Sequence, residues 1–95
     1  MQPCVYILSN DNNTTLYIGV TSDLVQRVAQ HHCNEGNAFT YRYGLHKLVF
    51  FEYHATMISA ISREKQLKSW SRKRKVELIE KINPLWLDLM SEDYN

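Results

Sequence analysis

The sequence predicts an α/β domain in which helices flank a small three-stranded antiparallel sheet, in the order β-β-α-β-α-α. Two short stretches of alternating apolar residues are separated by turn formers, a mostly apolar stretch follows near mid-chain, and helical apolar spacing recurs around it. With 95 residues the chain suffices for one domain, residues 1–95, with a modest core. We expect residues 91–95 to form a frayed tail.

The first two predicted strands form a hairpin. Apolar side chains alternate along residues 5–8 and 16–20, and residues 10–13 are all turn formers. If those four residues are the loop, Ser9 pairs with Thr14 and Tyr6 lies directly opposite Tyr17. The two tyrosines then share one face of the sheet, and the aliphatic side chains share the other.

A helix is predicted over residues 23–33, with capping residues at 21–23 and an apolar stripe of Leu24 and Val28. Arg27 and His31 lie one turn apart and flank this stripe. An arginine beside a core face needs an anionic partner or a water-filled cleft, so both are candidate site residues. The alternative is an arginine that extends to solvent and a hydrogen-bonded histidine. Residues 34–44 are predicted to be an aromatic loop.

The second half of the chain predicts a buried strand over residues 47–53 and a helix over 57–68 capped by Thr56. Glu64 lies on the apolar stripe of that helix, where a carboxylate needs a cation, a metal or several donors. The alternative is a buried ion pair, most simply with Arg27. A further helix is predicted over 71–82, and an apolar closing turn or helix over 85–89.

Positive charge is concentrated in residues 63–75, although the net charge of the chain is only +1. Segregated charge of this kind can bind a phosphate backbone, and the alternative is a solvated helix face. No apolar run is long enough to cross a membrane, and the two cysteines favour a reduced, cytoplasmic setting. The candidate DNA-binding residues are Arg63, Lys65, Lys68, Arg72, Lys73, Arg74 and Lys75.

Several of these features together resemble the GIY-YIG nuclease family, in its small standalone bacterial form related to the amino-terminal nuclease domain of UvrC-type repair proteins. The first tripeptide has Cys4 and Val5 where the family has Gly and Ile. Residues 63–68 resemble the segment around the metal-binding glutamate of the family. The resemblance is carried by Cys4-Val5-Tyr6, Tyr17-Ile18-Gly19, Arg27, His31 and Glu64.

This resemblance implies a GIY-YIG-like fold and hydrolysis of DNA phosphodiester bonds with one divalent metal, Mg²⁺ or Mn²⁺, in DNA repair or recombination. It implies that Glu64 is the metal ligand, that Arg27 neutralises the phosphate and that His31 can shuttle a proton. Tyr6 and Tyr17 match the two motif tyrosines, one of which orients or deprotonates the attacking water. Asn83 matches the asparagine that often ends the site.

A hard cation suits a site with a single glutamate, because one carboxylate together with water and phosphate oxygens can complete the coordination of Mg²⁺. A zinc site is not expected, since residues 31–33 are adjacent and cannot converge tetrahedrally with Cys4. Two other functions remain open. The first is a non-catalytic nucleic-acid-binding module that retains the nuclease fold, and the second is a protein-interaction domain that uses Trp70 and Trp86.

Overall fold

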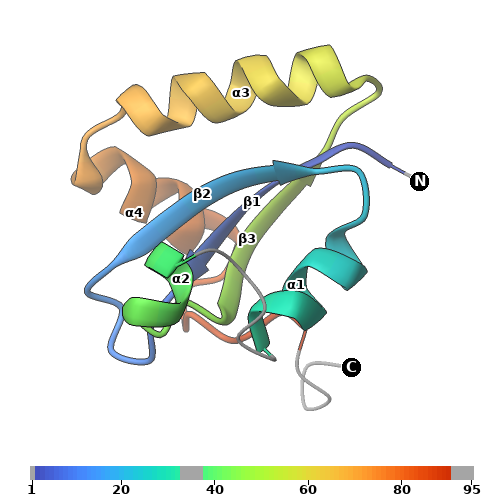
Figure 1. Cartoon of the computed structure of the whole chain (residues 1–95). Helices are drawn as coiled ribbons and strands as arrows, with labels where there is room; N and C mark the ends of the chain where they lie inside the picture. The colour runs from blue at the N-terminus through green and yellow to red at the C-terminus, as the bar shows by residue number, and fades with distance from the viewer. Residues whose placement is uncertain (1, 33–37, 91–95) are drawn as a thin grey trace.

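The computed structural model describes residues 2–32 and 38–90, so the predicted tail at 91–95 lies outside the described residues (Figure 1). The three strands form one antiparallel sheet in the order β2-β1-β3, which confirms the predicted fold class. The elements are β1 (Cys4–Ser9), β2 (Leu16–Thr21), α1 (Leu24–His32), α2 (Ala38–Arg42), β3 (Lys47–Tyr53), α3 (Met57–Ser69) and α4 (Arg72–Ile82).

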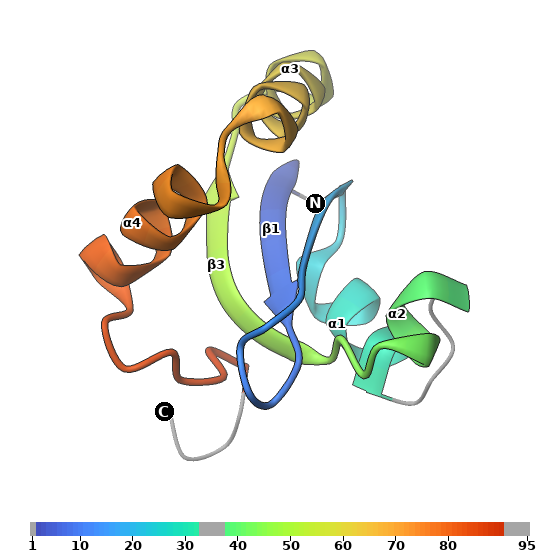
Figure 2. The same cartoon turned by 90° about the vertical axis from the view of Figure 1, so that its left-hand side faces the viewer.

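Each face of the sheet carries its own apolar cluster and its own helices. Figure 2 shows α4 on one side of the sheet and α1 and α2 on the other. On the side of α3 and α4, residues of β1, β2 and β3 pack against Ala60, Leu67 and Ile79. On the side of α1, Cys4, Tyr6 and Leu8 of β1 are among the residues that pack with Leu24 and Val28. Tyr6 therefore belongs to the α1 face.

The predicted register of the first hairpin is wrong by two residues. Tyr6 pairs with Gly19, and Ser9 pairs with Leu16 instead of Thr14. The cause is a longer loop, because the side-chain oxygen of Asn10 accepts hydrogen bonds from the backbone amides of Thr14 and Thr15 at 2.9 and 3.1 Å. Those two residues therefore cannot join the ladder, and the turn spans residues 10–15.

The two tyrosines still share a face in the corrected register. Tyr6 and Tyr17 are diagonal neighbours with ring centroids 6.4 Å apart and an interplanar angle of 42°. Diagonal residues on one face of a sheet remain within reach of each other when the side chains are aromatic. The expected pairing of the two phenols is thus kept by a different geometry.

Helix caps confirm most of the predicted helix bounds. Thr56 caps α3 by accepting from the amide of Ser59, and Ser71 caps α4 by accepting from the amide of Arg74. The expected loop over 34–44 is wrong at residues 38–42, where α2 forms. Five residues are too few to show helical periodicity in the sequence. After α4 the chain closes in turns, and no described helix has the length and apolar character that crossing a membrane requires.

Candidate active site

The ring of Tyr6 passes across the neighbouring strand at Gly19. A Cβ atom on Gly19 would lie 2.5 Å from both Cζ and Oη of Tyr6, closer than any real contact. A glycine inside a strand commonly marks such a close approach. Tyr6 is 2% exposed, so its ring is enclosed by its neighbours. Only the missing side chain of Gly19 lets the phenol of β1 lie against β2.

Charged and phenolic groups from three other elements act on this phenol. Burial raises the pKa of Tyr6 above its ordinary value, and Tyr17 and Glu64 raise it further, whereas Arg27 lowers it. Of these groups, Tyr17 is in ring contact with Tyr6, with the centroids 6.4 Å apart. The pKa of Tyr6 thus depends on predicted site residues from β2, α1 and α3 as well as on its own burial.

Glu64 is held on the inner side of α3. It lies between Ala60 and Leu67, which are both fully buried, and its own side chain is only 16% exposed. Within the described residues its ion pair is with Lys68, at 3.5 Å, and not with Arg27, which is exposed. The alternative in which Arg27 neutralises Glu64 in a buried pair is therefore not what the structure forms.

The donor set around Glu64 fits a hard divalent cation held by one protein ligand. In the described part of the chain, no three side chains of His, Cys, Asp or Glu gather as they would for a fully protein-bound metal. Mg²⁺ commonly keeps several waters and binds through one or two carboxylates and substrate phosphates. A single, partly exposed glutamate is compatible with that mode of binding.

The structure places the predicted site residue Asn83 in a supporting position beside β3. Its side chain is buried, and its amide nitrogen donates to the carbonyls of Val49 and Leu87 at 3.0 and 2.9 Å. Its oxygen accepts from the amide of Leu87 at 3.0 Å. The register between β1 and β3 shifts at Ile7 and Leu8, opposite Val49. Asn83 is thus committed to backbone groups, and we do not include it in the candidate site.

His31 lies within α1, but its side chain is outside the described residues. Its role in proton transfer remains a prediction. Sequence reasoning did not count Gly19 among the site residues, although a glycine between β-branched residues of a strand is a recognised sign of close packing.

The basic segment over residues 63–75 divides into two groups. Its arginines contact the protein itself: Arg63 and Arg74 lie 5.2 and 4.0 Å from the ring of Trp70. Arg72 donates to the backbone carbonyls of Asn13 and Thr14 in the first hairpin loop. Among the lysines, Lys65 and Lys73 are exposed, Lys68 is exposed and pairs with Glu64, and Lys75 is half-buried. The lysines are therefore the better candidates for contact with a phosphate backbone.

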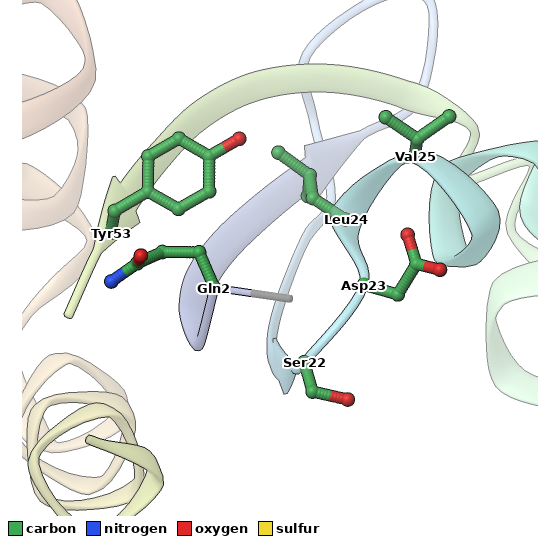
Figure 3. Close-up of a pocket in the computed structure, with 6 residues that line it drawn as sticks. All are labelled: Gln2, Ser22, Asp23, Leu24, Val25 and Tyr53. Atoms are coloured by element: carbon green, nitrogen blue, oxygen red, sulfur yellow. The ribbon is translucent and has the colours of Figure 1, made fainter. Parts of the chain in front are cut away.

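A pocket of about 380 Å³ lies elsewhere, at the start of α1 (Figure 3). Gln2 and Tyr53 stand on one side of it, and Leu24 and Val25 stand on the other. Its lining includes neither Tyr6 nor any of Tyr17, Arg27 and Glu64. We therefore give it no part in the chemistry of the candidate active site.

Comparison with known proteins identifies the family. The GIY-YIG catalytic domain matches residues 2–77. The chain belongs to the GIY-YIG family. The matched region includes Tyr6, Tyr17, Arg27 and Glu64 and ends before Asn83. The predicted resemblance is thereby confirmed.

Similar chains occur in archaea and bacteria. A UPF0213 protein of Haloquadratum walsbyi is 38% identical over 76 residues, which cover 80% of this chain and 84% of the relative. A UPF0213 protein of Staphylococcus haemolyticus is 33% identical over 80% of this chain and 92% of the relative. The solution structure of a UPF0213 protein of Bacillus halodurans, 24% identical, matches all of both chains with a TM-score of 0.59. That likeness supports the fold.

Proposed function

We propose that the chain is a divalent-metal-dependent endonuclease that hydrolyses DNA phosphodiester bonds with Mg²⁺ or Mn²⁺. The ring contact between Tyr6 and Tyr17, together with the effect of Arg27 and Glu64 on the pKa of Tyr6, supports the proposal most directly. Hydrolysis of a phosphodiester needs an oriented nucleophile, charge neutralisation at the phosphoryl oxygens and help for the leaving oxygen. The four side chains offer groups suited to these tasks.

Glu64 would hold the metal ion. A bound divalent cation supplies Lewis-acid stabilisation of the phosphoryl oxygens and lowers the pKa of a coordinated water. Lys68, which pairs with Glu64 at 3.5 Å, is exposed enough to turn away and contact a phosphate instead. The helix α3 would then present an acidic and a basic group one turn apart to the same phosphodiester.

Arg27 and the tyrosines would act on the substrate directly. The guanidinium of Arg27 is permanently charged and suits the neutralisation of a phosphate. The raised pKa of Tyr6 keeps its phenol protonated near neutral pH, so we assign Tyr6 to orient the water or a phosphoryl oxygen by hydrogen bonding. Accepting the proton then falls to Tyr17 or His31.

The exposed lysines beside Glu64 would bind the DNA backbone on either side of the reacting bond. Binding through phosphate contacts weakens steeply as salt rises. A cytoplasmic location and a role in DNA repair or recombination are part of the same proposal, and the resemblance to UvrC-type repair nucleases supports them.

The test is cleavage of supercoiled and branched DNA with Mg²⁺ or Mn²⁺, with and without a chelator. Glu64→Gln should reduce the rate by about 100-fold or more, because it removes the charge that holds the metal. Glu77→Gln makes the same chemical change at an exposed position of α4 and should leave the rate unchanged. DNA binding, measured by fluorescence anisotropy, should survive both changes.

A contrary result is easy to recognise. If the wild-type chain binds DNA but cuts none of these forms with either metal, the chain is a binding module that has kept the nuclease fold. If it shows no salt-dependent affinity for DNA either, the protein-interaction function becomes the better explanation.

A further inference from the structure

A second group of polar side chains is joined by short hydrogen bonds where β3 ends and α3 begins. His54 lies at its centre: Nδ1 is 2.7 Å from the hydroxyl oxygen of Ser59, and Nε2 is 2.7 Å from Oε1 of Glu52. None of these three residues belongs to the group around Tyr6. They form a serine, a histidine and a carboxylate in a chain of two contacts.

The partners of His54 determine how a neutral imidazole would bond at this position. Arg63 donates from Nε to Oε1 of Glu52 at 3.1 Å, so this oxygen of Glu52 acts as an acceptor. Nε2 of His54 must therefore carry the hydrogen that bonds to Glu52. In the neutral imidazole Nδ1 is then the acceptor, and Ser59 donates its hydroxyl proton to it. The hydroxyl oxygen of Ser59 keeps its lone pairs for an electrophile.

Ser59 is accessible from an adjoining pocket. The pocket has a volume of about 570 Å³, and Ser59, His54, Ile58 and Arg63 are among its lining residues. Ser59 is exposed, whereas the side chain of His54 is only 15% exposed. A nucleophile open to solvent beside a shielded base is the arrangement that nucleophilic catalysis requires.

The first turn of α3 adds hydrogen-bond donors beside this serine. The amides of Ser59 and Ala60 are taken by the side chain and the carbonyl of Thr56. The first amides of a helix have no acceptor within the helix, which leaves those of Met57 and Ile58 as donors at that end. Such amides can stabilise the negative charge that develops on a carbonyl oxygen during attack.

We propose that Ser59 is a catalytic nucleophile activated by His54 and Glu52, and that this pocket hydrolyses small carboxylic esters. The oxygen of Ser59 bonds to the ester carbonyl carbon while its proton passes to Nδ1 of His54. The bond from that carbon to the alkoxy oxygen then breaks, and His54 returns the proton to the departing alcohol. Water repeats the sequence on the acyl-serine, which frees the acid and restores Ser59.

The proposal is independent of the nuclease function. The same contacts could serve only to tie the end of β3 to the start of α3, in which case Ser59 would react like any exposed serine. The two possibilities differ in the reactivity of one hydroxyl group, which can be measured on the whole chain without DNA or metal.

The first experiment treats the chain with a fluorophosphonate probe, which forms an oxygen–phosphorus bond with an activated serine and releases fluoride. Peptide mass mapping should find the adduct at Ser59, and Ser59→Ala should abolish it. His54→Gln and Glu52→Gln should each slow labelling by about 100-fold or more, because general-base catalysis contributes roughly that factor. Ser62→Ala, the matched change one turn along α3 in the same pocket, should label like the wild type.

The second experiment follows the release of p-nitrophenol from p-nitrophenyl acetate. Release should exceed one equivalent per chain, should depend on Ser59 and His54, and should persist in Glu64→Gln, which lacks the proposed metal ligand. Three results would overturn the proposal: no adduct at Ser59 in the folded wild-type chain, equal labelling of His54→Gln, or ester turnover that survives Ser59→Ala. The first of these needs no variant, so misfolding of a variant cannot hide it.

Discussion

Replacing Gly19 by alanine tests whether the placement of Tyr6 matters. The new Cβ would lie 2.5 Å from Cζ and Oη of Tyr6, about 0.9 Å short of the 3.4 Å at which ordinary contacts begin. Both atoms belong to the side chain of Tyr6, which is 2% exposed, so the ring cannot swing into solvent. We expect the ring or the strand to shift by about 1 Å, and overpacking of this kind costs about 1–3 kcal/mol of stability.

The same displacement should reduce catalysis more than it reduces folding. A misplacement of about 1 Å at a reacting group can cost on the order of 100-fold in rate. We therefore expect Gly19→Ala to remain folded and to nick DNA about 100-fold more slowly than the wild type. Its affinity for DNA should change little, since no phosphate-binding lysine is moved.

A double-mutant cycle separates the clash from any other effect of the methyl group. In a Tyr6→Leu background the clashing ring atoms are absent, so adding Gly19→Ala should cost less than about 0.5 kcal/mol in urea unfolding. Equal costs in the two backgrounds would show that the ring is not the obstacle. A Gly19→Ala chain that nicks DNA like the wild type would show that the position of Tyr6 is not needed for cleavage.

Three further predictions test other parts of the structure. Tyrosines of the unfolded chain ionise near pH 10, whereas Tyr6 in the folded chain stays protonated, so the free energy of unfolding should fall above pH 10. Tyr6→Phe should reduce that fall in alkaline unfolding experiments. Asn83→Ala should lower the free energy of unfolding in urea by about 2–4 kcal/mol, because it leaves buried backbone groups without hydrogen-bond partners. The nicking rate of the folded fraction should stay unchanged. A loss of that rate would return Asn83 to the candidate site. Lys73→Ala and Lys75→Ala should each reduce the slope of log affinity for DNA against log salt concentration by about one phosphate contact, whereas Lys81→Ala should not change it. Equal slopes for the three variants would remove the basic segment from the DNA interface.

Features that depend on local pattern could be predicted from the sequence. The strand over 47–53 has the predicted bounds, and Thr56 and Ser71 cap the helices that follow them. Both signals lie within a few neighbouring residues, where periodicity and capping chemistry act. The family resemblance rested on the same short motifs and was confirmed by comparison.

Features that depend on distant partners could not be predicted in this way. The register of the first hairpin depended on the side chain of Asn10, which captures two amides across the loop. The arginines of the basic segment were candidate DNA-binding residues, and the structure shows that they also contact Trp70, Glu52 and the hairpin loop. No spacing within residues 63–75 reveals those partners, and the buried contacts of Asn83 with β3 were hidden for the same reason.

The segment after α4 also contacts the edge strand β3 at Leu48. The amide of Leu89 donates to the carbonyl of Leu48 at 2.8 Å, and the amide of Leu48 donates to Asp88 at 3.2 Å. An uncovered strand margin offers a template on which other chains can add and aggregate. Asp88 and Leu89 thus occupy the backbone groups of Leu48 on the edge strand β3, and we expect a chain shortened to end at residue 82 to self-associate more readily than the full chain in light-scattering measurements.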